Sequence, residues 1–550
     1  RETNTTCWFD AIQKEMKNVK VAFKFLEPGE RVPVGYKWIR CHLIFDVKMD
    51  FTRKARYVAG GHMTDPPSTL TYSSVVSRDS VRIGFLLAAL NDLELLAADV
   101  GNAYLNASTR ERVYTTAGLE FGAELQGKPV VIVRALYGLK SSGAAWRAHF
   151  ANTLNELKFQ SCLADPDVWF RSATKPNGFQ YYEYIFVYVD DLLVLSHQPA
   201  IIMKGLEEYY RLKDGFEKPK RYLGAEVIEW KFPDSADKTH WGLSSGQYVK
   251  EAIKNVEVTL AKDNLRLPGR CSMPLPSGYQ PELDSTPLLT DEAINYYQSQ
   301  ISILRWAIEL GRIDMYVDVV KLSHYLVNPR QGHLQAVYHI YAFLKHHERC
   351  TMVFDDKVLT FSSADFPEFD WMDFYGDVKE AIPPNAPEPR GNPVQMNVFV
   401  DANHAGNLVT RRSHTGILIY CNQAPIMWYS KAQKTVETST FGSEFVALRI
   451  AVELVEALRY KLRMMGIPLD GPANLFGDNS SVITNATVPS STLTKKHNAI
   501  CYHRVREAVA AKTVRITYIP TGQNLADMFT KSLNGCKLHE FCKKILYQMG

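Results

Sequence analysis

The chain has 550 residues, enough for about four domains of ordinary size. Hydrophobic residues make up 46% and charged residues 22%, which is typical of globular proteins and argues against extensive disorder. The 63 Lys and Arg side chains outnumber the 59 Asp and Glu side chains by four, so no global basic charge marks a nucleic-acid binder. Any such binding must come from the local placement of charge.

The nine cysteines are scattered and form no Cys-x-x-Cys pair, which favours a reducing compartment over a disulfide scaffold. No stretch of about 18 apolar residues occurs, so we expect no membrane span. The chain starts at Arg1 without a charged and apolar leader. We therefore expect no secretory signal, and the start without Met suggests a fragment or a piece processed from a longer chain.

The front of the chain mixes strand-like and helix-like segments. Apolar residues at three- and four-residue spacing predict helices over residues 144–157 and 296–310, and residues 284–347 are mostly helical in pattern. β-branched and aromatic runs predict strands over residues 181–196 and 222–230. Residues 381–393 (AIPPNAPEPRGNP) are rich in proline, which lacks a backbone donor, and predict a linker before one further domain.

Two adjacent acids interrupt the apolar residues 184–196 (YIFVYVDDLLVLS). The flanking runs predict two buried strands joined by a tight turn, with Asp190 and Asp191 at its tip. Carboxylates in such surroundings repel each other and are desolvated, so either their pKa values rise or a divalent cation neutralises them. An ordinary acidic hairpin turn is the alternative interpretation.

A third acid, Asp99, lies in residues 95–107 (LLAADVGNAYLNA), at the end of an apolar run. Alone it is typical of a turn that follows a strand. Together with Asp190 and Asp191, it predicts a site for two Mg²⁺ ions about 4 Å apart, as in-line nucleotidyl transfer needs.

Four acids in the back half follow the order strand, helix, strand and helix. They are Asp401 at the end of a strand over residues 396–401, Glu444 in an amphipathic helix over residues 441–464, Asp478 after a strand that begins at residue 473, and Asp527 in NLADMFTK at the start of a terminal helix. Each of these acids alone is typical of a helix cap or a surface charge.

Four motifs of the front half, in their order, resemble the reverse transcriptases of copia-type LTR retrotransposons. Residues 188–191 (YVDD) resemble the YxDD box, and residues 99–104 (DVGNAY) resemble the box with the first catalytic Asp. Residues 135–146 (ALYGLKSSGAAW) resemble the block between these boxes, and residues 54–59 (KARYVA) resemble a fingers segment. The resemblance covers nearly the whole chain.

The resemblance implies a multidomain α/β and α+β protein, a right-hand polymerase followed by a ribonuclease H-like α/β domain. Its expected parts are fingers and palm over residues 1–232, thumb and connecting helices over residues 233–380, the linker over residues 381–393, and the nuclease over residues 394–550. In the family, the three front acids bind the catalytic metals. That role carries over to Asp99, Asp190 and Asp191, of which the last contributes less directly.

The resemblance also implies residues that contact the nucleotide. Tyr104 lies five residues after Asp99, where related polymerases place an aromatic gate that clashes with a 2′-hydroxyl; a core tyrosine is the alternative. Lys54 and Arg56 are expected to meet the incoming triphosphate, with a solvated basic stretch as the alternative. Ser141 replaces a Gln that lies near the nucleotide in the family, so affinity or fidelity is expected to differ.

The order of the four back-half acids resembles ribonuclease H. Residues 413–416 (SHTG), 428–431 (WYSK) and 524–531 (NLADMFTK) match the copia-type version of that domain. The resemblance implies that Asp401, Glu444, Asp478 and Asp527 bind two Mg²⁺ ions, one activating water and the other stabilising the leaving 3′ oxygen.

The expected function is therefore that of an RNA- and DNA-directed DNA polymerase with an attached hybrid nuclease. Its expected cofactor is Mg²⁺, with Mn²⁺ as an alternative, at two ions per site. Its expected partners are an RNA template, a DNA primer, the RNA–DNA hybrid and dNTP, and no association with a membrane is expected. The sequence leaves open whether the protein is a monomer or a dimer. The expected location is the cytoplasm, within virus-like particles, with the nucleus as an alternative. A domesticated, non-catalytic nucleic-acid-binding subunit is the alternative function, motivated by the altered residues 141–144.

Overall fold

The structure is a computed structural model that describes residues 6–27, 29–47, 52–64, 71–235, 237–493 and 496–547. It divides into two compact units, and each is built from several segments of the chain. The first contains Arg1–Val76, Glu94–Arg171 and Glu183–Pro219, and the second contains Ser77–Leu93, Ser172–Tyr182 and Lys220–Gly550. None of the helices in the described ranges has the length and apolar character that a membrane crossing requires.

A six-stranded sheet forms the centre of the first unit. Its strands, in spatial order, are β12 (Leu212–Glu217), β5 (Glu94–Val100), β11 (Asp191–Ser196), β10 (Gln180–Tyr188), β9 (Val168–Thr174) and β8 (Gln160–Ser161). The helices α3 (Ala103–Asn106), α4 (Ser142–Glu156) and α5 (Pro199–Glu207) supply apolar residues to the core beside this sheet. β10 and β11 confirm the predicted strand–turn–strand segment, because the apolar runs on both sides of the two acids are buried.

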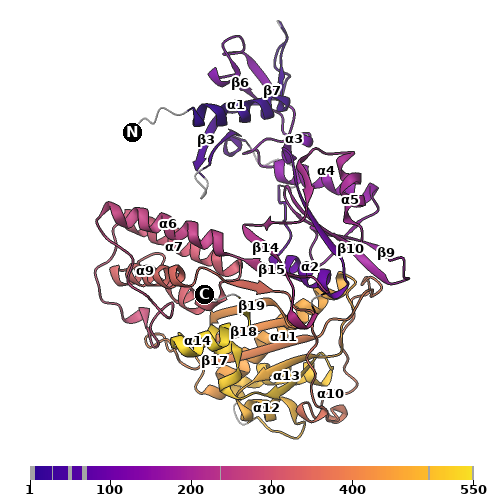
Figure 1. Ribbon diagram of the computed structural model, residues 1–550, viewed down its shortest axis with the longest axis vertical. Helices are drawn as coiled ribbons and strands as arrows, with labels where there is room; N and C mark the ends of the chain where they lie inside the picture. The colour runs from indigo at the N-terminus through magenta and orange to yellow at the C-terminus, as the bar shows by residue number, and fades with distance from the viewer. Residues whose placement is uncertain are drawn as a thin grey trace. The chain divides into compact units, whose positions relative to one another are not determined.

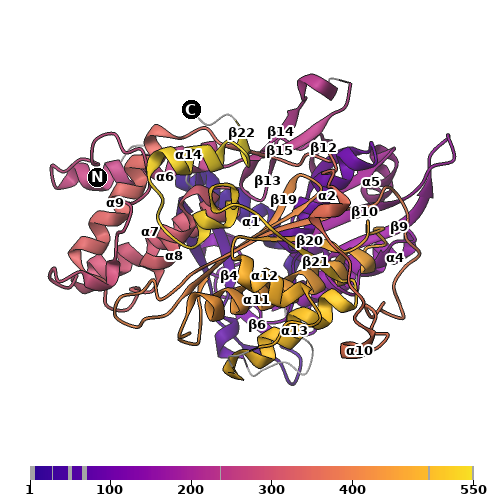
Figure 2. The ribbon, with the colours of Figure 1, turned by 90° about the horizontal axis from the view of Figure 1, so that it is seen from below.

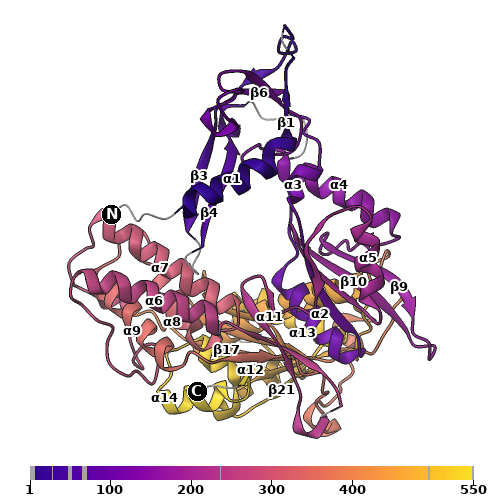
Figure 3. The same cartoon turned by 45° about the horizontal axis from the view of Figure 1, so that its top comes forward.

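Two smaller sheets complete the first unit. One is four-stranded, in the order β1 (Phe23–Phe25), β7 (Pro129–Ile132), β6 (Val113–Thr116) and β2 (Lys37–Trp38). The other is the hairpin of β3 (Cys41–Val47) and β4 (Arg53–Ala59), with α1 (Cys7–Val19) beside it (Figure 3). β4 alternates buried and partly exposed residues, so its two faces differ in chemistry.

The second unit begins with α2 (Arg78–Leu90), a helix that is buried almost all round. A five-stranded sheet follows, in the order β13 (Arg221–Tyr222), β14 (Ala225–Trp230), β15 (His240–Ser244), β16 (Thr351–Val353) and β22 (Leu546–Tyr547). The predicted strand over residues 222–230 is interrupted by a two-residue turn, because Leu223 and Gly224 both adopt positive φ.

The predicted helical region of the second unit is confirmed. Its helices are α6 (Gly246–Lys262), α7 (Asp291–Glu309), α8 (Tyr316–Ser323) and α9 (Gln331–His346). α6, α7 and α9 lie side by side (Figure 1). The short helix α10 (Met372–Tyr375) precedes the proline-rich segment, in which the described residues 381–393 form no helix or strand. Two hydrogen bonds hold this segment in place: the Tyr182 hydroxyl donates to the carbonyl of Glu388 at 2.8 Å, and the Asn392 side-chain amide donates to that of Leu90 at 2.7 Å.

The last sheet has the order β19 (Ala424–Ala432), β18 (His414–Cys421), β17 (Met396–Asn403), β20 (Ala473–Gly477) and β21 (Val514–Tyr518). The first three strands are antiparallel, and β20 and β21 add in parallel. α11 (Thr440–Met464) and α13 (Ala499–Ala510) pack against this sheet (Figure 2), and α12 (Ser480–Thr487) and α14 (Gly535–Cys542) complete the region. Asp527 lies in a short 3-10 helix, η10 (Leu525–Phe529), rather than at the start of an α-helix.

Candidate active sites

The turn between β10 and β11 carries the two adjacent acids of the first unit. Tyr188 pairs with Asp191, so Val189 and Asp190 form a two-residue turn. Val189 has φ +59°, a strained value for a β-branched residue. Two hydrogen bonds hold the turn: Trp146 Nε1 donates to the Val189 carbonyl, and the Val100 amide donates to the Asp190 carbonyl, each at 2.8 Å.

The strand register brings the third acid of this unit beside the turn. Asp99 on β5 is the direct partner of Asp191, and opposite residues of an antiparallel pair point to the same face. Lys213 on β12 pairs with Asp99 on its other side, and its ammonium lies 3.3 Å from Asp99 Oδ2. The structure therefore brings Asp99, Asp190 and Asp191 together at one end of these strands, with the Lys213 ammonium beside Asp99.

The three acids are half-buried and repel one another. Burial and the charge of Asp99 raise the pKa of Asp190, an effect that Lys54 and Lys213 oppose. Burial and the charges of Asp190 and Asp99 raise the pKa of Asp191 to about 6. Oxygen ligands in this state suit a hard divalent cation, which removes both the repulsion and the cost of desolvation.

The predicted nucleotide-contacting residues fall into two groups. The ring of Tyr104, on α3, is half-buried, and burial with the charge of Asp190 raises its pKa. Lys54 and Arg56 lie on β4, and the charge of Lys54 acts on Asp190. Ser141 differs from these three, because it is buried and its hydroxyl donates to Glu111 Oε1 at 2.6 Å.

Three acids of the second unit converge closely. Asp401 on β17, Glu444 on α11 and Asp478 after β20 each offer an oxygen, and these atoms lie within 4.8 Å of one another. Burial and the charge of Asp527 raise the pKa of Asp401 to about 7, although the Thr530 hydroxyl donates to its Oδ2. Burial and the charges of Asp401 and Asp478 raise the pKa of Glu444 well above its usual range.

The fourth acid, Asp527, is fully buried beside this cluster and is paired with two lysines. Lys531 lies 2.8 Å from its Oδ1 and Lys537, on α14, lies 2.6 Å from its Oδ2. The loop that carries Asp527 packs tightly on β18: a Cβ added to Gly416 would lie 2.6 Å from the carbonyl oxygen of Ala526. Only glycine at this position lets the loop approach so closely.

Several of these contacts were not predicted from the sequence. Lys213, Trp146 and Thr530 touch the acids or the turn, and each is far from its partner along the chain. Thr530 and Lys531 belong to the NLADMFTK segment that was singled out for Asp527, so that segment carried a signal for them. Lys213 has no such signal, because its place depends on the pairing of β12 with β5.

The chain that carries these two acidic sites is similar to several known proteins. The family described as reverse transcriptase (RNA-dependent DNA polymerase) matches residues 21–266. The putative transposon Ty5-1 protein of Saccharomyces cerevisiae is 30% identical over 251 residues, which cover 45% of this chain and 74% of that protein. The chain belongs to the copia-type LTR-retrotransposon Pol polyprotein family. The predicted α/β and α+β fold class is confirmed by the mixed sheets, and its front part matches the reverse transcriptase family.

Longer members of this Pol family match along nearly the whole chain. The Pol polyprotein from transposon TNT 1-94 of Nicotiana tabacum is 25% identical, covering 98% of this chain and 37% of that protein. The Pol polyprotein from transposon RE1 of Arabidopsis thaliana is 26% identical, covering 94% and 32%. The chain therefore spans about a third of these polyproteins. The solved structure of the foamy viral protease-reverse transcriptase in complex with RNA/DNA hybrid is 13% identical, with a TM-score of 0.45, over 95% of this chain and 54% of that chain.

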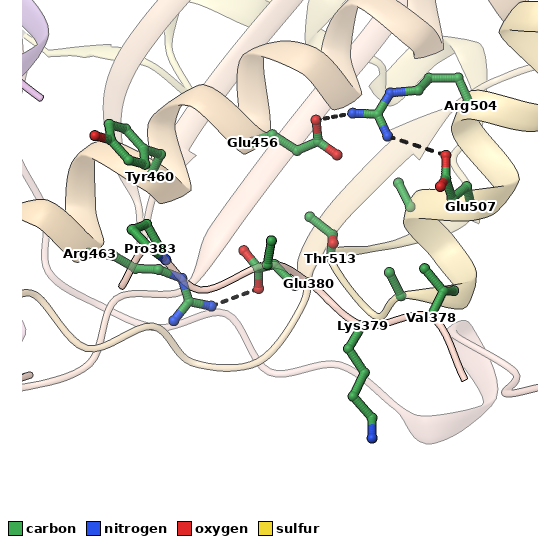
Figure 4. Close-up of a pocket in the computed structure, with 13 residues that line it drawn as sticks. Val378, Lys379, Glu380, Pro383, Glu456, Tyr460, Arg463, Arg504, Glu507 and Thr513 are labelled. Carbon is green, nitrogen blue, oxygen red and sulfur yellow. Dashed lines mark hydrogen bonds and ion pairs between the residues drawn. The ribbon is translucent and has the colours of Figure 1, made fainter. Parts of the chain in front are cut away.

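A cavity of about 340 Å³ in the second unit of this Pol chain lies away from the acids. It is lined by α11, α13 and residues 378–383, and none of the seven predicted acids borders it. Most of its charges are paired with one another: Arg504 contacts Glu456, and Arg463 lies 2.7 Å from Glu380 (Figure 4). A cavity whose cations and anions already neutralise each other has no net charge with which to select a ligand.

Proposed function

We propose that the first unit carries the polymerase site of a reverse transcriptase that extends a DNA primer on RNA and then on DNA. The observation that carries this proposal is the register that sets Asp99 against the Asp190–Asp191 turn, in a chain of the reverse transcriptase family. Asp99 and Asp190 are assigned as ligands of two Mg²⁺ ions, with Asp191 in a supporting role. The ions supply electrostatic stabilisation of the attacking and leaving oxygens during attack of the primer 3′-hydroxyl on the α-phosphate.

The same proposal assigns the nucleotide-contacting side chains. Tyr104 sits beneath the sugar and excludes a 2′-hydroxyl, while Lys54 and Arg56 meet the triphosphate. The charge of Lys54 acts on Asp190 and the charge of Asp190 acts on Tyr104, which supports this grouping. Ser141 acts indirectly, because its hydrogen bonds to Glu111 fix the start of α4.

For the second unit we propose cleavage of the RNA strand of RNA–DNA hybrids. Asp401, Glu444 and Asp478 already converge, and the raised pKa values of Asp401 and Glu444 indicate charges that a bound cation neutralises. Asp527 becomes the fourth ligand when Lys531 and Lys537 release its carboxylate. Mg²⁺ here supplies activation of water and stabilisation of the leaving 3′ oxygen, and Mn²⁺ is the alternative ion.

We also propose how the chain is divided into domains. We assign fingers and palm to residues 1–232, thumb and connecting region to residues 233–380, a linker to residues 381–393 and the nuclease to residues 394–550. The partners are an RNA template, a DNA primer, the hybrid and dNTP, and the place of action is a virus-like particle in the cytoplasm.

The test separates the two sites with matched substitutions. Asp190→Asn should abolish primer extension on an RNA template with Mg²⁺ and leave hybrid cleavage intact, and Asp478→Asn should do the reverse. Asp470→Asn, at an exposed position, is the control and should change neither activity. Loss of both activities in either single variant would contradict two independent sites. No Mg²⁺-dependent extension or cleavage by the unmodified chain would instead favour the non-catalytic binding subunit.

A further inference from the structure

Tyr137 lies between the residues assigned to the sugar and to the triphosphate. It belongs to the ALYGLK block, and its ring centroid is 4.9 Å from that of Tyr104, at an interplanar angle of 66°. The guanidinium of Arg56 lies 5.7 Å from the centroid of the same ring. An edge-on aromatic pair and a cation over a ring are both attractive geometries, so one side chain contacts both groups favourably.

The backbone of Tyr137 is fixed to the strand that carries Arg56. The Ala59 amide, at the end of β4, donates to the Tyr137 carbonyl at 2.7 Å. The next residue, Gly138, has φ +92°, and a Cβ added there would lie 2.1 Å from the Ala59 carbonyl oxygen. Because this approach requires glycine, β4 and the Tyr137 backbone form one rigid junction.

The Tyr137 ring and the charge of Glu15 both act on the Arg56 guanidinium. Its Nε is buried and has no hydrogen-bond partner among the described residues. Its contact with the face of the Tyr137 ring is therefore a main constraint on the guanidinium plane. Burial and the charge of Asp190 raise the pKa of Tyr137 to about 12, so the ring stays neutral at working pH and remains an attractive surface for a cation.

We infer that Tyr137 is a positioning residue that couples sugar selection to triphosphate binding. Its ring holds Tyr104 in place beneath the sugar and aligns Arg56 toward the phosphates of the same nucleotide. This inference rests on the proposed polymerase function and deepens it. Only a side chain with a flat, apolar face can contact both the Tyr104 ring and the Arg56 guanidinium in this way. Phenylalanine should therefore preserve the function of Tyr137, and an aliphatic residue should not.

The experiment measures incorporation of a single dNTP and of the matching rNTP by the full chain. Tyr137→Leu should raise rNTP incorporation relative to dNTP by about tenfold, because small displacements at a reacting centre have large effects, and should raise KM for dNTP. Tyr137→Phe should keep the ratio of the unmodified chain. Tyr209→Leu, an exposed tyrosine of the same unit, is the control for the loss of an aromatic ring.

A double-mutant cycle shows whether Tyr137 affects sugar discrimination through Tyr104. If Tyr137 acts through Tyr104, then Tyr104→Val combined with Tyr137→Leu should discriminate no worse than Tyr104→Val alone. Tyr137→Met replaces the leucine variant if that variant does not fold. Unchanged discrimination in the folded variant, while Tyr104→Val relaxes it, overturns the inference. Absence of dNTP extension by the unmodified chain overturns the proposed function instead.

Discussion

Asp318 offers a sharp test of how the helices of the second unit hold the loop that carries Asp527. It lies on α8, is 3% exposed, and accepts the hydroxyl of Ser532, which itself accepts from Lys321 Nζ at 3.2 Å. Burial raises the pKa of Asp318 to about 6, although Lys321 and Ser532 favour its charged form. Asp318→Asn keeps a hydrogen-bond acceptor and removes the ability to ionise.

The rise from the usual 3.8 to about 6 corresponds to about 3 kcal/mol of folding free energy. Between these pH values the folded state holds a proton on Asp318 that the unfolded state has released. Its stabilisation is therefore fully present below pH 3.8 and is lost as pH rises to about 6. The asparagine variant should gain up to about 3 kcal/mol over the unmodified protein across this window and keep that advantage above it.

The assay is hydrogen–deuterium exchange of peptides that contain residues 525–533, recorded from pH 4 to pH 7. Comparing the two proteins at each pH cancels the titration of Asp401, which both retain. Asp373→Asn, an exposed aspartate on α10, is the control and should follow the unmodified protein. Parallel pH curves for Asp318→Asn and the unmodified chain would refute the argument that Asp318 is protonated in the folded state.

Three further substitutions probe contacts around the two sites. Gly416→Ala should displace the loop that carries Asp527 and lower hybrid cleavage at least about tenfold, with primer extension unchanged; equal cleavage would contradict the tight packing. Lys537→Met removes one partner of Asp527, so it should cost about 1–3 kcal/mol in thermal unfolding while lowering the Mg²⁺ concentration for half-maximal cleavage. Trp146→Phe loses the hydrogen bond to Val189, at about 1 kcal/mol, and single-turnover extension should slow while cleavage does not.

Local patterns in the sequence predicted the elements that carry the acids. The apolar runs around Asp190 specify β10 and β11 because both strands are buried on two faces, and the spacing around Glu444 specifies α11. The partners of these acids depend on pairings that no local pattern contains. Lys537 reaches Asp527 across a turn between two short helices, and the two-residue strand β22 is too short to show any periodicity.

The proline-rich segment illustrates the same limit. Its composition predicts a linker or long loop, but not the hydrogen bonds to Leu90 and Tyr182 that hold it. Likewise, Asp527 was expected to begin an α-helix, and it lies in a 3-10 helix because the close contact with Gly416 and the two lysine pairs determine the local backbone. Long-range packing decides these details.

The helix α2 has a consequence for how the chain is made and divided. Residues 80–90 of this helix are all buried, and Arg82 within it stacks on Trp428 at 3.7 Å and donates to the Ile426 carbonyl at 3.0 Å. These partners lie on β19, so during synthesis the face of α2 around Arg82 stays uncovered until some 340 further residues have been made. A recombinant fragment that stops at the end of the polymerase match, residue 266, would leave that face bare. Such a fragment should aggregate unless β19 is supplied with it.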